Sequence, residues 1–302
     1  MVEVQRKAHA KVNLFLRMAG RREDGYHLLY SCMQTLDLHD MIFIKLVPAE
    51  KGETGGLSFI SNCDYLPLDP KQNTTVDAAA RFIRKIGETG YHVRICLLKE
   101  IPSQAGLGGG SSDAAAVLDA MDSLFPGRVS REELLEMALA IGADVPFFLT
   151  GGTALCEGVG EKVSLLPELS GIPMLLLKPP QGVSTPACYK KWDEMGCPPI
   201  SDEEKELILQ DLKNPKDPVL RLADACRRWS NDLEAPAIGL VPEISEGLDV
   251  LRKLGAIYTA MTGSGSCIFG FFANERAVPS LSCPEIQALR ERKWWVTQTE
   301  TV

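Results

Sequence analysis

The feature that most constrains this chain is a glycine-rich stretch between an apolar segment and a helical pattern. From residue 101 to residue 113 it runs Ile101-Pro102-Ser103-Gln104-Ala105-Gly106-Leu107-Gly108-Gly109-Gly110-Ser111-Ser112-Asp113. Glycine has no Cβ, so such a loop can turn its backbone N–H groups toward one point. A helix behind the loop adds free N–H groups and the positive end of its dipole. The pattern therefore predicts an anion site suited to phosphate.

The helix behind the loop is predicted by apolar residues at helical spacing over residues 114–125. Ser111 or Ser112 is expected to cap it, and Asp113 is expected in its first turn. The Pro-Gly pair at residues 126–127 should end it. We therefore expect two serine hydroxyls beside the anion.

Two commoner phosphate loops are excluded. The nucleoside-triphosphatase loop needs a Gly-Lys dipeptide, which the chain lacks. In the dinucleotide fingerprint counted from Gly106 and Gly108, the third glycine position is Ser111, and no acidic ribose partner follows at the expected distance. A surface loop without a ligand is the alternative, but the position between a strand and a capped helix favours the anion site.

Composition narrows the class of protein. The chain has 302 residues, 45% hydrophobic and 24% charged, as in ordinary globular proteins. Its net charge of −8 argues against a general binder of nucleic acid or anionic membrane. Nine cysteines without a Cys-x-x-Cys pair, and only four histidines, indicate reduced thiols in a cytoplasmic protein without a zinc cluster.

The remaining elements mix strands and helices without a regular rhythm, which favours an α+β fold. Strands are expected at residues 8–18, 41–47, 93–98, 152–157 and 174–178, and twice within 256–272. Further helices are expected at 73–87, 130–139, 219–229 and 243–254, and loops at 179–180 and 193–218. We expect two domains, residues 1–158 and 159–302.

Two charged residues have apolar neighbours. Asp144 lies between Gly142 and an apolar run, where an aspartate is either a helix-end cap or a functional carboxylate. Lys11 lies within a predicted strand, where a lysine is ordinarily solvated at an edge. The residues alone leave both alternatives open.

At several separate places the chain resembles the GHMP kinases. Their second motif, Pro-x-x-x-Gly-Leu-Gly-Ser-Ser-Ala, is similar to residues 102–114, and their first motif, Ala-Lys-hydrophobic-Asn-Leu, is present at residues 10–14. Gly-x-Asp-Val-Pro-Phe-Phe is present at residues 142–148. Residues 262–266 resemble the third motif, with threonine in place of the usual serine, although they could form only a hairpin turn.

The resemblance implies a fold and a set of roles in the reaction. The expected fold is α+β, with an N-terminal domain like ribosomal protein S5 domain 2 and a ferredoxin-like C-terminal domain. Lys11 and Asp144 would be catalytic, and Asn13 would bind the alcohol of the substrate. The loop residues 102 and 105–112 would bind ATP, with Asn73 at the adenine. Thr262 and Gly263 would support the loop and the substrate phosphates.

Residues 24–28, Asp-Gly-Tyr-His-Leu, could be only a turn followed by a half-buried tyrosine and histidine. The glycine-rich motif is similar to the branch of the family that phosphorylates the 2-hydroxyl of 4-diphosphocytidyl-2-C-methyl-D-erythritol in non-mevalonate isoprenoid biosynthesis. That resemblance implies Tyr26 stacking on cytosine and His27 reading its edge. Tyr189 is the candidate for the other face of the base, although a plain buried tyrosine fits its pattern nearly as well. Residues 231–234 resemble a family segment that we interpret as a helix cap.

The expected activity is therefore that of a small-molecule kinase that uses ATP and Mg²⁺, with the magnesium ligands unassigned. Its partners would be ATP and a cytidyl diphosphate alcohol, without nucleic acid or membrane, in a monomer or weak homodimer. A sister kinase for homoserine or mevalonate is one alternative, and Tyr26 and His27 argue against it because those substrates have no base. An inactive nucleotide sensor is another, and the presence of Lys11 and Asp144 argues against it.

Overall fold

A computed structural model describes residues 2–50, 55–87, 90–213, 219 and 228–302. The chain forms two compact units that are interleaved along the sequence. The first unit comprises residues 1–10, 38–102 and 108–151, and the second comprises residues 11–37, 103–107 and 152–302. Two long strands, β1 (Val2–Arg21) and β2 (His27–Pro48), are each divided between the units. The domain boundary expected between residues 158 and 159 stays a prediction.

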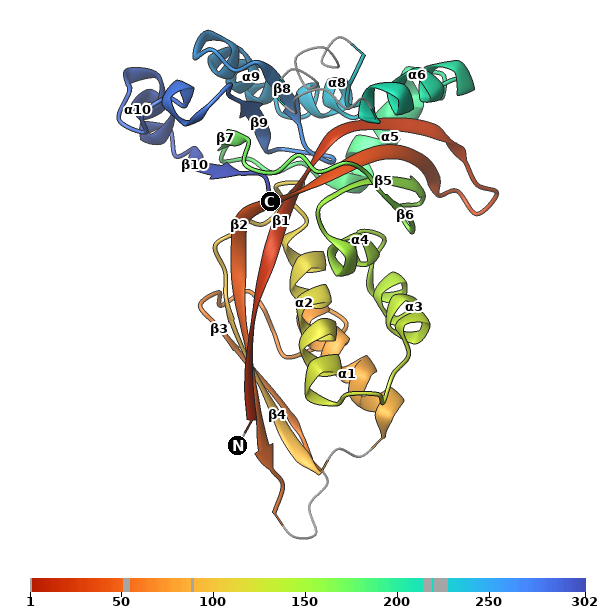
Figure 1. The fold of residues 1–302 in the computed structure, drawn as a ribbon. Coiled ribbons are helices and arrows are strands. Elements are labelled where there is room, and N and C mark those ends of the chain that lie inside the picture. The colour runs from red at the N-terminus through yellow and green to blue at the C-terminus, as the bar shows by residue number, and fades with distance from the viewer. Residues whose placement is uncertain (1, 51–54, 88–89, 214–218, 220–227) are drawn as a thin grey trace. The chain divides into compact units, whose positions relative to one another are not determined.

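The first unit packs helices against a sheet (Figure 1). The second part of β2 pairs antiparallel with β4 (Tyr91–Leu98), and β3 (Leu57–Ser61) pairs parallel with β4. In β4 the alternate side chains of Val93, Ile95 and Leu97 are buried, as the period-two pattern predicts. They face a core shared with the helices α1 (Thr74–Ile86), α2 (Gly109–Leu124), α3 (Arg131–Ile141) and α4 (Val145–Thr150).

The second unit contains a four-stranded antiparallel sheet in the order β10-β7-β9-β8. The strands are β7 (Pro173–Lys178), β8 (Tyr258–Met261), β9 (Ile268–Phe271) and β10 (Trp295–Glu300). Helices connect β7 to β8 and β9 to β10, which gives the β-α-β-β-α-β order of ferredoxin-like folds. The predicted α+β class and the ferredoxin-like C-terminal part are confirmed.

The other elements of this unit complete its core. The first part of β2 pairs with β5 (Thr153–Gly158), which pairs with β6 (Lys162–Leu165). The helices are α5 (Thr185–Met195), α6 (Asp202–Leu212), α8 (Glu234–Ile238), α9 (Glu243–Lys253) and α10 (Pro284–Glu291), with a 3₁₀ turn η1 (Glu275–Ala277). Apolar side chains from β7, β9, α5, α9 and α10 form one cluster.

Most predicted elements are present, but the start of α2 and the loop over residues 193–218 differ from the prediction. Helix α2 begins at Gly109 with Gly108 as its N-cap, so Ser111 and Ser112 are not caps and Asp113 lies just beyond the first turn. The reason is that Gly108 adopts a φ of +73°, which lets the helix start earlier.

The loop predicted over residues 193–218 contains the end of α5 and all of α6. A capping box starts α6, with Ser201 accepting from Glu204 N and the Glu204 carboxylate accepting from Ser201 N. Residues 214–218, and most of the helix expected at 219–229, lie outside the described residues.

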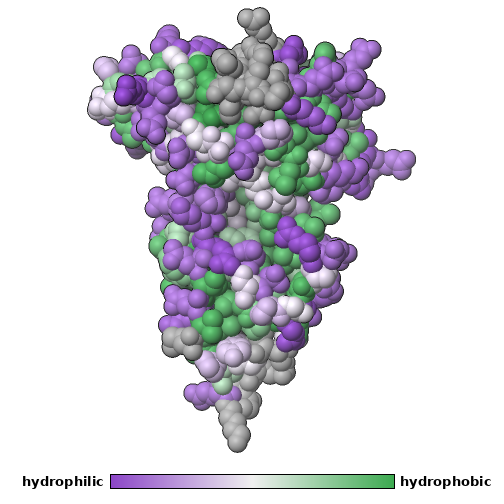
Figure 2. All heavy atoms as spheres, in the orientation of Figure 1, coloured by the Kyte–Doolittle hydropathy of each residue, from purple (hydrophilic) through white to green (hydrophobic). Residues whose placement is uncertain are grey.

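The surface is largely hydrophilic on the face shown in Figure 2, with smaller hydrophobic areas between. Within the described ranges, no helix has the length and apolar character required to cross a bilayer.

Candidate active site

The second half of the glycine-rich loop lies in the first unit, at the start of α2. No side chain caps this helix, so its first N–H groups are left to bond with another partner, such as an anion. The Thr74 hydroxyl donates to the Gly110 carbonyl at 2.7 Å, which joins the first turns of α1 and α2. This end of α2 is therefore held in place and has the donors that an anion requires.

The first half of the loop lies in the second unit, against the third motif. The Thr262 hydroxyl lies 3.1 Å from the Gly106 carbonyl and donates to it. Lys11 N donates to the Leu107 carbonyl at 3.0 Å, and Cys267 N donates to the Ala105 carbonyl at 3.2 Å. The first and third motifs therefore both hold the loop backbone.

Gly106 has a conformation and a contact that exclude other residues. Its φ is +73°, and a Cβ would lie 2.1 Å from the Thr262 carbonyl oxygen. We predict that Gly106→Ala moves the loop and weakens binding of an ATP analogue by about 10-fold or more, since misplaced donors lose their preorganised geometry. Isothermal titration calorimetry and thermal unfolding measure both effects.

Gly127→Ala is the matched control, because Gly127 has a φ of +72° and a Cβ there would meet nothing within 4 Å. It should cost about 1 kcal/mol of stability from backbone strain and leave nucleotide affinity unchanged. A folded Gly106→Ala protein with the wild-type affinity would contradict the prediction.

Lys11 is the centre of a polar network in the second unit. The Lys11 side chain is 3% exposed, and its Nζ donates to Asn13 Oδ1 at 2.5 Å. Asn13 in turn donates from Nδ2 to the Ser31 hydroxyl at 2.8 Å and from its backbone N to Thr262 Oγ1 at 3.0 Å. A Cβ on Gly263 would lie 3.5 Å from Lys11 Nζ, so the ammonium group faces the turn of the third motif.

The sequence did not predict how that turn is held. Asn231 Nδ2 donates to the carbonyls of Met261 and Gly263, each at 2.8 Å, and Asn231 Oδ1 accepts from Leu233 N. The helix cap expected at residues 231–234 is not formed, because the N-cap of α8 is Leu233, which makes no side-chain capping bond. Asn231 instead forms a turn just before α8, and the same side chain fixes the third motif. Ser31 is a further residue that the sequence gave no reason to single out.

The predicted base-binding residues are partly gathered in the second unit. The rings of His27 and Tyr189 are 4.9 Å apart and tilted by 34°, and His27 packs edge-on against Trp192. His27 Nε2 donates to Asp193 Oδ1 at 2.7 Å. Because Nε2 of His27 carries the donated proton when the ring is neutral, its Nδ1 is left as an acceptor for a ligand. Tyr26 is 66% exposed.

Asp144 and Asn73 lie in the first unit. Asp144 occupies the N-cap position of α4 but makes no capping bond, which weakens the cap interpretation. Asn73 is the cap of α1, accepting from Thr75 N and donating to the Pro67 carbonyl. Both of its side-chain groups are engaged in the fold, and its contact with adenine stays a prediction.

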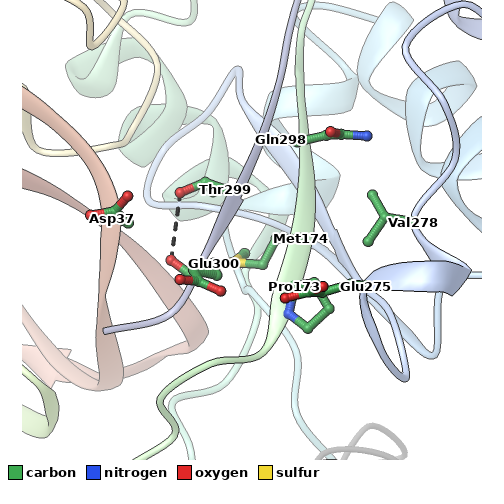
Figure 3. Close-up of a pocket in the computed structure, with 8 residues that line it drawn as sticks. All are labelled: Asp37, Pro173, Met174, Glu275, Val278, Gln298, Thr299 and Glu300. Atoms are coloured by element: carbon green, nitrogen blue, oxygen red, sulfur yellow. Dashed lines mark hydrogen bonds between the residues drawn. The ribbon is translucent and has the colours of Figure 1, made fainter.

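A cavity of about 320 Å³ lies elsewhere in the second unit (Figure 3). Its lining residues are Asp37, Pro173, Met174, Glu275, Val278, Gln298, Thr299 and Glu300. Three of these side chains are carboxylates and none is cationic, so the cavity is unsuited to a phosphate. None of the predicted site residues lines it.

Comparison with known proteins agrees with the motifs. Residues 73–152 match the family described as the GHMP kinases N terminal domain, and residues 205–289 match the GHMP kinases C terminal family. A 4-diphosphocytidyl-2-C-methyl-D-erythritol kinase of Caldicellulosiruptor saccharolyticus is 38% identical over 269 residues, which cover 89% of this chain and 88% of that protein. One of Clostridium botulinum is 38% identical over 266 residues, covering 88% and 90%.

Solved structures give the same result. A crystal structure of 4-(cytidine 5'-diphospho)-2C-methyl-D-erythritol kinase has a TM-score of 0.75 and 34% identity, covering 99% of this chain and all of that one. A homoserine kinase from Cytophaga hutchinsonii has a TM-score of 0.71 at 18% identity, over 99% and 94% of the two chains, and shares the fold. The predicted GHMP-kinase fold is confirmed, and this chain belongs to the 4-diphosphocytidyl-2-C-methyl-D-erythritol kinases of the GHMP kinase family.

Proposed function

We propose that this chain transfers the terminal phosphoryl group of ATP to the 2-hydroxyl of 4-diphosphocytidyl-2-C-methyl-D-erythritol, giving the 2-phosphate and ADP in non-mevalonate isoprenoid biosynthesis. The observation that carries the proposal is the junction of three motifs in the second unit. There Thr262 bonds both to Asn13, the partner of Lys11, and to the Gly106 carbonyl. A cation, a polar anchor and a phosphate loop are the parts that phosphoryl transfer to an alcohol requires.

ATP is proposed to bind with its phosphates on the N–H groups of the glycine-rich loop and of the first turn of α2. It enters as its magnesium complex, so the ion is part of that substrate. Ser111 and Ser112 follow the first glycines of α2, and Ala105, Leu107 and Pro102 shape the loop before it. Support for this placement comes from the uncapped helix start and from the backbone bonds that hold the loop.

Lys11 and Asp144 are proposed as the catalytic pair. The Lys11 ammonium would stabilise the alkoxide that forms as the 2-hydroxyl loses its proton. Asp144 would accept that proton or orient the hydroxyl in a loose transfer. The proton leaves the substrate oxygen for the Asp144 carboxylate, the oxygen forms a bond to the γ-phosphorus, and the bond from that phosphorus to the ADP oxygen breaks.

The cytosine is proposed to bind beside His27, with Tyr26 and Tyr189 contributing ring faces. Asp193 accepts from His27 Nε2, so His27 Nδ1 can accept a hydrogen bond from the ligand. Cytosine has an amino donor where uracil has a carbonyl oxygen, and an acceptor therefore favours cytosine. This arrangement gives a physical reason for a cytidyl substrate.

A phosphorylation assay tests the proposal. We expect turnover with the cytidyl diphosphate alcohol and little with its uridyl analogue, homoserine or mevalonate. His27→Phe keeps a ring against Tyr189 and removes the nitrogens, so it should raise KM for the cytidyl substrate about 10-fold and leave KM for ATP unchanged. His92→Phe, in β4 of the first unit, is the matched control.

Two results would reject the proposal. One is turnover of homoserine or mevalonate at the cytidyl rate, which would indicate a sister kinase. The other is ATP binding without transfer to any of these alcohols, which would indicate a nucleotide sensor.

We further propose a cytoplasmic monomer or weak homodimer without a nucleic-acid or membrane partner, and the net charge of −8 supports this.

A further inference from the structure

Three buried ionisable side chains in the first unit have no role in the reaction described above. Lys99 Nζ forms ion pairs with Asp40 Oδ2 and, at 2.7 Å, with Asp113 Oδ2. The side chains of Lys99, Asp40 and Asp113 are 9%, 0% and 3% exposed. We call these three residues the buried ion cluster. With so little water, its interactions are stronger than those of surface pairs, and removing Lys99 or Asp40 leaves an uncompensated charge.

The buried ion cluster connects both ends of the glycine-rich loop to the sheet. Asp40 is in β2, and its Oδ1 accepts from the backbone N of Glu100 and, at 2.8 Å, of Ile101, where the loop begins. Asp113 is in α2, where the loop has ended. Lys99 connects the two carboxylates, so one ammonium group fixes the entry of the loop relative to its exit.

The same ammonium group lies against the first residue of α2. A Cβ on Gly109 would lie 3.2 Å from Lys99 Nζ. Lys99 therefore places positive charge beside the N–H groups that we assign to phosphate, and the ionised carboxylate of Asp40 offsets that charge. Burial opposes the charged form of Lys99, but the carboxylates outweigh it and raise the pKa of Lys99.

We propose that Lys99, Asp40 and Asp113 are positioning residues for ATP: the cluster holds the first turn of α2 and the loop entry in the arrangement that binds the phosphates. A loop of consecutive glycines has many accessible conformations, so its donors are preorganised only where its ends are fixed. The inference rests on the proposed function in one respect, that this loop binds ATP.

The charge state of Asp113 gives a second consequence. Burial raises the pKa of the Asp113 carboxyl to about 8, against the lowering effect of Lys99 and with a further rise from Asp40. Among the residues that the structure describes, Lys99 and Asp40 are the charged groups that act on it from the neighbouring segments. Below that pKa the cluster is neutral, with one ammonium and one carboxylate. Above that pKa, the cluster has a net negative charge beside the anion site, and this charge disfavours binding of the ATP phosphates.

Calorimetric titration with a non-hydrolysable ATP analogue, and separately with cytidine diphosphate, tests the proposal. Lys99→Met should lower the affinity for the ATP analogue about 10-fold or more and leave the affinity for cytidine diphosphate unchanged. The reason is that the lost interactions orient the N–H donors to phosphate. Asp113→Asn keeps an oxygen that accepts from Lys99 and should retain most of the affinity at pH 7. Between pH 7 and pH 9 the wild-type affinity should fall, and that of Asp113→Asn should stay level.

Asp119→Asn is the control, because Asp119 lies further along α2 in a half-exposed pair with Arg6 and should change neither affinity. If Lys99→Met does not fold, Asp113→Ala provides the same comparison with Lys99 still paired to Asp40. A folded Lys99→Met or Asp113→Ala protein with wild-type ATP-analogue affinity, or with equal losses for both ligands, overturns the proposal. So do identical pH profiles for the wild type and Asp113→Asn. Absence of turnover with the cytidyl alcohol would instead reject the proposed function. It would not change the measured affinities, which test the positioning role separately.

Discussion

Asp144→Asn should lower kcat by about 10²–10⁴-fold, the usual contribution of a positioned proton acceptor, and change KM for either substrate only slightly. Asparagine has nearly the shape of aspartate but cannot take a proton. Asp144 occupies an N-cap position without making a capping bond, so the substitution should also leave α4 intact. Steady-state kinetics together with a thermal unfolding curve measure the effect.

Asp249→Asn is the control for this change, because Asp249 is an exposed residue of α9 paired with Arg252. It should have wild-type kinetics. A folded Asp144→Asn enzyme with near-normal kcat would show that this carboxylate takes no part in the chemical step. The proton would then leave by another route, such as directly to water or to the phosphoryl group.

Lys11→Met should lower kcat by about 10²–10³-fold, the range seen when one donor to a developing negative charge is removed. Methionine keeps the length and apolar stem of lysine but has no charge. The expected loss is in kcat because the alkoxide exists only as the reaction proceeds. Lys11→Arg should not restore activity, because the amine lies in a confined place between Asn13 and the turn at Gly263.

Lys190→Met, at an exposed position of α5 where the side chain is 79% exposed, is the corresponding control and should leave kcat unchanged. Whether Lys11→Met changes kcat or KM decides the role of Lys11. If Lys11→Met raises only KM for the alcohol, the lysine binds the ground state and the assigned stabilisation of the alkoxide is wrong.

Elements with local signals could be predicted from the sequence. Helix α1 begins after Asn73, and α3 begins with the capping box of Ser130 and Glu133, as their end signals indicate. The loop before α2 was also identified, because a glycine cluster between a strand and a helix is a short-range pattern. Helix α6 has the same kind of signal at Ser201 and Glu204, which the polar composition of residues 193–218 obscured.

The partners of the site residues could not be predicted, because they lie far apart in the chain. Asp193 meets His27 across 166 positions, and Asn231 reaches the turn at Gly263 from a different segment. The partnership of Lys99 with Asp40 depends on strand register, since β2 and β4 pair with Met41 opposite Leu98. No local pattern encodes which charged side chains a sheet brings together.

The interleaving of the two units affects how the protein is made. The second unit needs residues 11–37 and 103–107, which leave the ribosome early, and residues 152–302, which leave it later. Leu36 forms a bridge with Thr301, and Val302 N donates to the Thr35 carbonyl at 3.1 Å. The early segments therefore cannot form these contacts until residues 301 and 302 have been synthesised. Neither unit can be produced alone from one continuous fragment, and a cut after residue 158 would leave Lys11 and Thr262 on separate pieces.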